Sequence, residues 1–341
     1  MKYLVGYKLS GADELPFTSI MEPYWDHISE VFFPWVDSPG GRNAIGVQHG
    51  WKDWGAQQQL EAEIYEIRRR GVKLDLLFNA NCYGGEAISE VLDNRVASII
   101  DRIMEITGGP DVITTASPFI AERVKKRFPG IEVRASVNMW IGTVKAMEYL
   151  SDLYDSFYVQ REYNRDLEHV KEMSDWCKKN GKKLYMLGNS GCLSFCTGHT
   201  FHDNLVAHEQ EVSEMRNVEN FRPMTCWRYF AKRENWPAFL QNSWVRPEDI
   251  HHYEGLVEGV KLATRTHSRP GLVVSSYVRG KFLGNLLDLC EPGFAPVFDS
   301  HIIDSTRIPE DFFERTSTCA RQCHKCDYCK KVLEKALVRM D

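Results

Sequence analysis

The sequence lacks the segments that would carry a chain into or across a membrane. No stretch approaches the roughly 18 consecutive apolar residues that a bilayer-spanning helix needs. The opening MKYLVGYKLSGADELP has neither the long apolar core nor the small-residue cleavage site of a signal peptide. We therefore expect a cytoplasmic protein with no membrane partner.

An excess of positive charge is also absent. The formal net charge is −5, so no overall basic field attracts nucleic acid. This net charge does not exclude a local basic groove that binds nucleic acid. Internal repeats and low-complexity segments are missing as well. With 43% hydrophobic and 26% charged residues among 341, the composition is that of an ordinary globular protein.

Several catalytic and cofactor motifs are missing too. The sequence has no G-x-S-x-G elbow, and His208-Glu209 lacks the second His of the H-E-x-x-H zinc motif. No G-x-G-x-x-G follows the first expected strand, which disfavours a dinucleotide-binding fold. These absences also weigh against a hydrolase.

What is present is a regular alternation of short apolar runs and amphipathic helical stretches. Expected strands lie at 3–7, 30–35, 73–79, 111–115, 132–137, 156–160, 183–187 and 259–264. Such alternation predicts parallel βα units, and eight of these close into a (β/α)₈ TIM-like barrel in the α/β class. An open doubly wound sheet is the alternative. We place the barrel in residues 1–290, with a long insertion at 188–244 between strands 7 and 8, and a Cys-rich C-terminal tail in 291–341.

The ten cysteines carry the strongest chemical signal. A reducing compartment disfavours disulfides, so clustered cysteines there indicate metal ligands or redox groups. Cys177 and Cys290 stand in helical or apolar surroundings and fit small buried hydrophobes. The other eight stand beside turn residues or in tight groups.

The tail contains the densest group, T-C-A-R-Q-C-H-K-C-D-Y-C-K. Its Cys319, Cys323, Cys326 and Cys329 have the short spacings that bring thiolates to one point, as a 4Fe–4S cluster or a tetrahedral zinc ion requires. We favour iron–sulfur, and zinc remains open. The first three also match the spacing of the radical-SAM motif, but their C-terminal position disfavours that chemistry.

A second group follows the seventh strand, in G-N-S-G-C-L-S-F-C-T-G-H-T-F-H-D-N. In a barrel, loops after strands lie on the catalytic face, and Cys192 and Cys196 are one helical turn apart. Cys226 in the same insertion is a third candidate ligand of a 4Fe–4S cluster, and Cys82 after the third strand is the candidate for the fourth. Alternatively, the fourth position is open for substrate or is filled from the tail. The chain would then hold one or two clusters.

Other polar residues near strand ends are candidates for substrate contacts. Arg161 and Glu162 follow the sixth strand and suit an anion anchor and a proton-handling carboxylate, or a structural ion pair. Arg265 ends the eighth strand and suits a carboxylate or phosphate, or a rim salt bridge. His199 and His202 suit metal binding or proton transfer, or ordinary hydrogen bonding.

The sequence resembles the collagenase-like peptidase family, peptidase family U-thirty-two, and in particular its iron–sulfur-containing branch. The resemblance lies in the motifs F-N-A-N-C-Y-G, V-Q-R-E-Y-N, the motif around Cys192 and W-V-R-P-E-D-I-H-H-Y with G-V-K-L-A-T-R. The resemblance covers most of residues 1–290. It implies a (β/α)₈ barrel and, in several members, cluster-dependent oxygen-independent hydroxylation of RNA or quinone precursors. The four-Cys tail and the long insertion depart from the family pattern.

The sequence therefore predicts an iron–sulfur oxidoreductase acting on a small anionic or aromatic substrate at the barrel mouth, for example by oxygen-independent hydroxylation. An electron-donor protein would be a further partner. One alternative is a metal-dependent peptidase or other hydrolase of the collagenase-like family. Another is a non-catalytic iron–sulfur scaffold or electron carrier.

Overall fold

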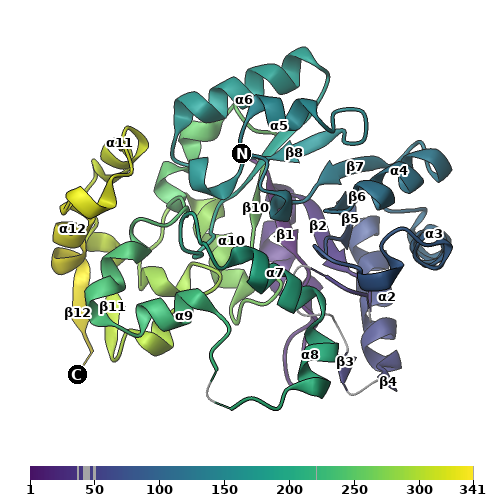
Figure 1. The fold of residues 1–341 in the computed structure, drawn as a ribbon, viewed down its shortest axis with the longest axis horizontal. Coiled ribbons are helices and arrows are strands. Elements are labelled where there is room, and N and C mark those ends of the chain that lie inside the picture. Colours follow the sequence, from purple (N-terminus) through teal and green to yellow (C-terminus); the bar gives the residue numbers. More distant parts are fainter. Residues whose placement is uncertain (37, 41–46, 49–50, 220, 341) are drawn as a thin grey trace.

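The computed structural model describes residues 1–36, 38–40, 47–48, 51–219 and 221–340 and contains a closed barrel of parallel strands (Figure 1). In spatial order the strands are β1 (Tyr3–Gly6), β2 (Ile28–Pro34), β5 (Lys73–Phe78), β6 (Val112–Thr115), β7 (Glu132–Ala135), β8 (Ser156–Tyr158), β9 (Lys183–Leu187) and β10 (Gly259–Leu262), and β10 pairs with β1. The predicted (β/α)₈ TIM-like barrel is confirmed.

Helices follow most of the strands and surround the barrel (Figure 1). They are α1 (Phe17–Met21), α2 (Trp54–Arg69), α3 (Glu90–Thr107), α4 (Pro118–Arg127), α5 (Val144–Glu148), α6 (Leu167–Lys179), α7 (His199–Ala207), α8 (Glu209–Met215), α9 (Thr225–Phe230), α10 (Pro270–Arg279), α11 (Phe312–Ser317) and α12 (Tyr328–Ala336). Single-turn and 3₁₀ segments lie at η1 (Glu22–His27), η2 (Gly84–Glu86), η3 (Val137–Met139), η4 (Arg161–Tyr163), η5 (Arg233–Phe239), η6 (Pro247–Tyr253), η7 (Leu286–Asp288), η8 (Ala295–Val297), η9 (Ser305–Arg307) and η10 (Cys323–Lys325).

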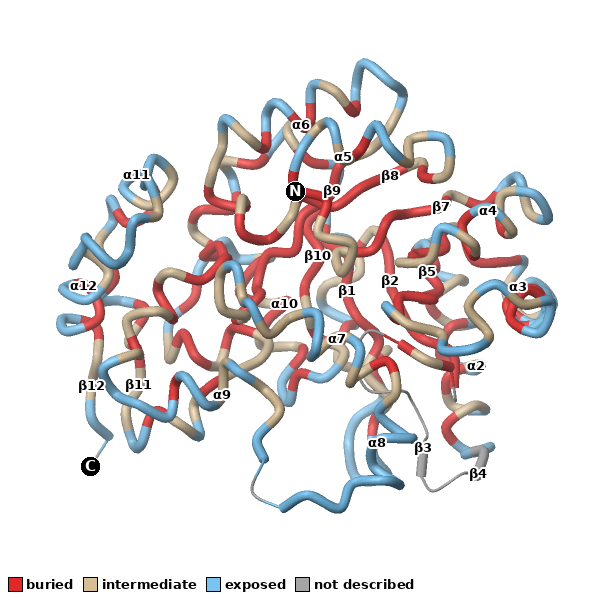
Figure 2. The backbone as a smooth tube through the Cα atoms, in the orientation of Figure 1, coloured by how far each residue is buried: buried red, intermediate tan, exposed pale blue. Residues whose placement is uncertain are grey.

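Local sequence explains where the long helices begin. The side chains of Asp53, Ser89, Ser117 and Asp166 each accept a hydrogen bond from a backbone N–H in the first turn of α2, α3, α4 and α6. Gly108 ends α3 in the left-handed conformation, which glycine adopts without a Cβ clash. Each helix then turns an apolar face to the strands, so the strands are buried (Figure 2).

The barrel has two apolar regions. The larger one fills the space between strands and helices. The smaller one lies inside the barrel and consists of inward-facing side chains of five strands, namely Leu4, Phe32, Leu77, Tyr158 and Tyr185. The rest of the interior is occupied by charged groups, which are described with the site below.

The insertion and the C-terminal segment pack together at one side of the barrel, where Figure 1 shows α9 near β11 (His301–Ile303) and β12 (Leu337–Arg339). Aromatic rings join them. Trp236 stacks on Phe298 with centroids 4.4 Å apart, and Trp244 stacks on Phe312 at 6.0 Å. The segment after residue 290 is thus packed on the insertion, and the division of the chain at 290 stays a prediction.

None of the helices described is long and apolar enough to cross a membrane. The cytoplasmic location stays a prediction.

Candidate functional site

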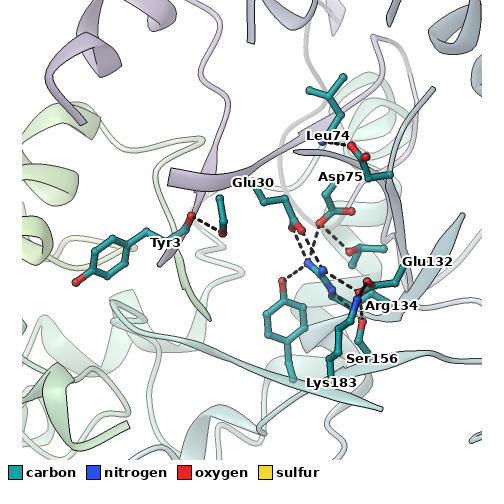
Figure 3. Close-up of polar contacts among 12 residues, drawn as sticks. Tyr3, Glu30, Leu74, Asp75, Glu132, Arg134, Ser156 and Lys183 are labelled. Carbon is teal, nitrogen blue, oxygen red and sulfur yellow. Dashed lines mark hydrogen bonds and ion pairs between the residues drawn. The ribbon is translucent and has the colours of Figure 1, made fainter. Parts of the chain in front are cut away.

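An ion network that sequence reasoning missed occupies the barrel interior (Figure 3). Arg134 on β7 is fully buried, and its guanidinium contacts carboxylates from three strands. Its Nη1 lies 2.6 Å from Glu30 and 3.6 Å from Asp75, and its Nη2 lies 3.0 Å from Glu132. Lys183 pairs with the second oxygen of Glu132. Because a buried charge is costly unless it is paired, these residues are stable in the barrel only as a set.

The pKa values of two further side chains in the barrel interior are shifted. Burial, with the negative charge of Glu30, raises the pKa of Asp75 to about 8. Burial lowers the pKa of Lys261 to about 8. The Lys261 ammonium lies 3.8 Å from the ring centroid of Phe32, so an aromatic face replaces part of its lost hydration.

Lys261 lines a small cavity of about 80 Å³ that is built largely from residues at or after strand ends. The walls also carry Asn79, Asn138, Arg161, Arg265 and Glu291. The predicted candidates Arg161 and Arg265 are thus brought together beside an amine, which makes this cavity suitable for a carboxylate or phosphate.

Arg161 connects this cavity to the insertion. Its guanidinium lies 4.7 Å from the ring of Trp140, and its Nη1 is 3.5 Å from the sulfur of Cys192. Trp140 in turn contacts His199, with centroids 3.9 Å apart. His202 lies on the same helix α7 as His199.

The cavity of about 80 Å³ beside Lys261 is called the mouth cavity below, and Glu162 is not among the residues that line it. One carboxylate oxygen accepts a hydrogen bond from the backbone N–H of Phe195 at 3.3 Å. Its side chain lines a larger cavity of about 410 Å³, together with Cys196 and three tail cysteines. The adjacent Arg161 and Glu162 therefore serve different cavities, which their neighbouring positions in sequence do not reveal.

Cys82 has a different set of partners from the one that the sequence suggested. It follows β5, and its interaction with the His208 side chain lowers the pKa of its thiol. The backbone N–H of Gly84 donates to the same sulfur at 3.4 Å. His208 Nδ1 lies 3.0 Å from a carboxylate oxygen of Glu211. Cys82, His208 and Glu211 thus form a connected thiol–imidazole–carboxylate group, which we call the Cys82 triad.

The junction between α7 and α8 positions the triad. His208 stands between the two helices, and Glu211 lies one turn further on. Gly84 adopts a positive φ of 54°, and a Cβ there would lie 3.5 Å from the His208 ring. The positive φ therefore favours glycine at this position, whereas a Cβ would make only an ordinary contact with the imidazole.

The remaining predicted barrel ligands lie near one another. Burial raises the pKa of Cys226 to about 12, and the sulfurs of Cys192 and Cys196 add to that rise. The four tail cysteines are also neighbours, because Cys319, Cys323 and Cys326 all raise the pKa of Cys329, which burial raises to about 11. Within the described ranges, however, no three His, Cys, Asp or Glu side chains are arranged to hold a metal ion.

The comparisons with known proteins point to peptidases. No protein-family model matches the chain. An uncharacterized protease of Methanocaldococcus jannaschii is 23% identical over 284 residues, which span 82% of each chain. Among solved structures, the U32 peptidase Mk0906 is similar with a TM-score of 0.53 and 16% identity, covering 76% of this chain and 91% of that one.

These findings overturn the predicted activity. The expected iron–sulfur oxidoreductase was wrong, because the relative and the structural neighbour are both named as peptidases and the predicted cluster ligands are not assembled as a metal site in the described residues. The hydrolase, weighed as an alternative, fits better. The relative is named a protease and is similar over most of both chains, and the structural neighbour has the same barrel fold.

Proposed function

We propose that this protein is a thiol-dependent hydrolase that cleaves peptide bonds, with Cys82 as its nucleophile. The observation that carries the proposal is the Cys82 triad, in which the thiol interacts with the imidazole and the imidazole interacts with the carboxylate. A nucleophile within hydrogen-bond reach of a base that a third group orients is the general signature of covalent acyl transfer. The relationship to peptidases supports the same chemistry.

Each residue of the triad has one role in this proposal. His208 takes the thiol proton, and the Cys82 sulfur attacks the scissile carbonyl carbon to form a carbon–sulfur bond. The carbon–nitrogen bond then breaks, and His208 returns the proton to the leaving amine. Water attacks the thioester carbon while His208 takes a proton from that water. The carbon–sulfur bond then breaks and His208 returns the proton to the sulfur, which leaves the carboxylic acid and the free thiol. The N–H of Gly84 stabilises negative charge on the sulfur.

The mouth cavity supplies the substrate preference. Arg161 and Arg265 face it with Lys261 beside them, so it is suited to an anionic group of the peptide. Trp140, which packs against Arg161, offers an aromatic wall next to that cation. We therefore expect peptides with an acidic side chain or a terminal carboxylate to be preferred.

Membership of the iron–sulfur branch of the family is part of the proposal, separate from the hydrolysis. Its support is that Cys192, Cys196 and Cys226 are neighbours close to the mouth cavity. A cluster there would be a structural or substrate-binding centre. A lower content of iron and acid-labile sulfide in anaerobically purified Cys192→Ser than in wild type supports it, whereas an unchanged content, or wild-type protein without iron, contradicts it.

The proposal is tested by replacing the nucleophile. Cys82→Ala should lower kcat/KM on a quenched fluorescent peptide library at least about 10³-fold, as expected when a covalent nucleophile is lost. The control is Cys177→Ala, because Cys177 is buried in helix α6 and lies outside the triad. Cys177→Ala should keep its activity.

A second measurement does not depend on knowing the substrate. Because hydrogen bonds from His208 and Gly84 lower the pKa of the Cys82 thiol, iodoacetamide should modify Cys82 faster than an unstructured cysteine peptide at pH 7. Peptide cleavage that survives Cys82→Ala, or a Cys82 thiol no more reactive than the peptide, would overturn the proposal.

A further inference from the structure

The larger cavity lies between two segments that are far apart in sequence. It has a volume of about 410 Å³, and its walls carry Cys196 from the insertion and Cys319, Cys323 and Cys329 from the tail. The Cys82 triad does not contribute to it. A concentration of thiols on one cavity is unusual in a protein of ordinary composition and calls for a separate chemical explanation.

The tail thiols have the local geometry of a metal-binding turn. The backbone N–H of Arg321 donates to the sulfur of Cys319 at 3.3 Å, and a single 3₁₀ turn begins at Cys323. Such N–H···S bonds orient thiolates around a metal and reduce their basicity. Cys319, Cys323 and Cys326 are exposed, so their side chains can rotate toward a common point, whereas Cys329 is half-buried and fixed.

A buried cation lies beside this group. Arg165 is buried, its guanidinium lies over the rings of Trp244 and Phe312, and its hydrogen bonds go to backbone carbonyl oxygens of Leu240 and Trp244. In the part of the chain that the structure describes, no carboxylate forms an ion pair with it. Because a buried guanidinium is costly without a counter-charge, this arrangement indicates that negative charge belongs in the adjacent cavity.

An orphaned acceptor faces the same cavity. Glu162 is 6% exposed, and its Oε2 has no hydrogen-bond partner among the residues described. A buried carboxylate oxygen without a donor needs a cation, a bound water or a ligand. The cavity therefore contains one buried acceptor without a donor among the described residues, Glu162 Oε2, and a buried guanidinium, Arg165, that is hydrogen-bonded to backbone carbonyl oxygens.

We propose that the tail binds a thiophilic metal centre through Cys319, Cys323, Cys326 and Cys329, seated at this cavity and holding the tail against the insertion. Four thiolates around Zn²⁺, or around a [4Fe–4S]²⁺ cluster, leave a net charge of −2 by arithmetic. On the cavity wall, Arg165 supplies positive charge toward such a centre, and Arg321, which also pairs with Asp166 at 3.4 Å, supplies a second cation. The two metals share this thiolate chemistry, and the experiment separates them.

The test uses the full chain, purified anaerobically, with metal and acid-labile sulfide measured per chain. Wild type should contain the tail centre, as one zinc without sulfide or as an iron–sulfur cluster, and Cys323→Ser and Cys326→Ser should each lose that one centre. Cys177→Ala, which removes a thiol far from the tail, should keep it. Metal-free wild type, or unchanged metal in both tail variants, would overturn the proposal.

Thiol footprinting gives the same answer without a variant. Cys319, Cys323 and Cys326 are exposed and should react with iodoacetamide rapidly if they are free. With the metal bound they should react at least about tenfold more slowly, and a chelator should restore the fast rate. Equal rates before and after chelation contradict the proposal. The same mass spectra report Cys82 separately, so the failure of the metal site and the failure of the hydrolase are distinguishable.

Discussion

The thiol of Cys82 and the imidazole of His208 perturb each other in opposite directions. The hydrogen bond to His208 lowers the pKa of Cys82, and the hydrogen bond to Cys82 raises the pKa of His208. Both shifts act in the direction that favours a thiolate–imidazolium pair. Activity should rise as Cys82 loses its proton and should fall at higher pH, as His208 loses the proton that the leaving amine needs.

Glu211 tunes this pair, and its substitution is a prediction at the scale of one residue. Its carboxylate raises the pKa of both His208 and Cys82, so Glu211→Gln should move both limbs of the pH–rate profile to lower pH. Because the Glu211 side chain is 74% exposed, solvent screens its charge, and we expect a loss of kcat of only about tenfold.

The measurement is kcat/KM against pH for the peptide substrate, with the rate of iodoacetamide modification of Cys82 as a second profile. Glu214→Gln, on the same helix, is the matched control. A profile of Glu211→Gln that coincides with wild type would show that Glu211 does not orient His208.

Single residues of the interior were predictable in part. Glu30, Asp75, Arg134 and Lys261 are charged residues in short, largely buried strands, and the alternation of side chains along each strand places them on its inward face. Applying parity to every strand would have identified the buried network. The sequence could not show that Arg134 bridges three carboxylates, because the pairing depends on which strands face each other across the barrel.

At the scale of elements, helices α7 and α8 complete the site that β5 begins. The side-chain amide of Asn81, after β5, donates to the carboxylate of Asp203 on α7 at 3.1 Å. This contact ties the helix pair to the loop that carries Cys82. The position of His208, at the end of α7, therefore depends on how firmly α7 is held.

Asp203→Ala should loosen this attachment. We expect faster amide hydrogen exchange across residues 199–215 and a several-fold lower rate of Cys82 modification, with exchange in the barrel strands unchanged. Asp175→Ala, on the surface of α6, removes a comparable exposed carboxylate and serves as control. If exchange in α7 and α8 does not change, the Asn81–Asp203 contact does not hold the helices.

For the whole molecule, the ion network inside the barrel is a condition of stability. Arg134 contacts side chains from β2, β5 and β7, so its loss leaves several buried carboxylates without a counter-charge. Arg134→Met should lower the free energy of unfolding by about 3–5 kcal/mol, the usual cost of breaking a buried ion pair.

Urea denaturation followed by circular dichroism measures this loss. Arg102→Met is the control, because Arg102 pairs with Glu61 and Glu105 at the surface, where ion pairs contribute little. Its unfolding midpoint should stay close to that of wild type. If the two variants lose similar stability, the interior network does not hold the barrel together.

The sequence by itself determined the barrel, its strands and the two groups of cysteines. The physical reason is that the alternation of strands and helices, the helix caps and the spacing of the cysteines depend on residues that are near one another in the chain. Only the tertiary structure placed Cys82 beside His208, 126 residues later by their numbers, and set the tail against the insertion around one cavity. The physical reason is that contacts between distant segments depend on the packing of whole elements. The thiol that the sequence assigned to a cluster therefore became a candidate nucleophile when its neighbours were known.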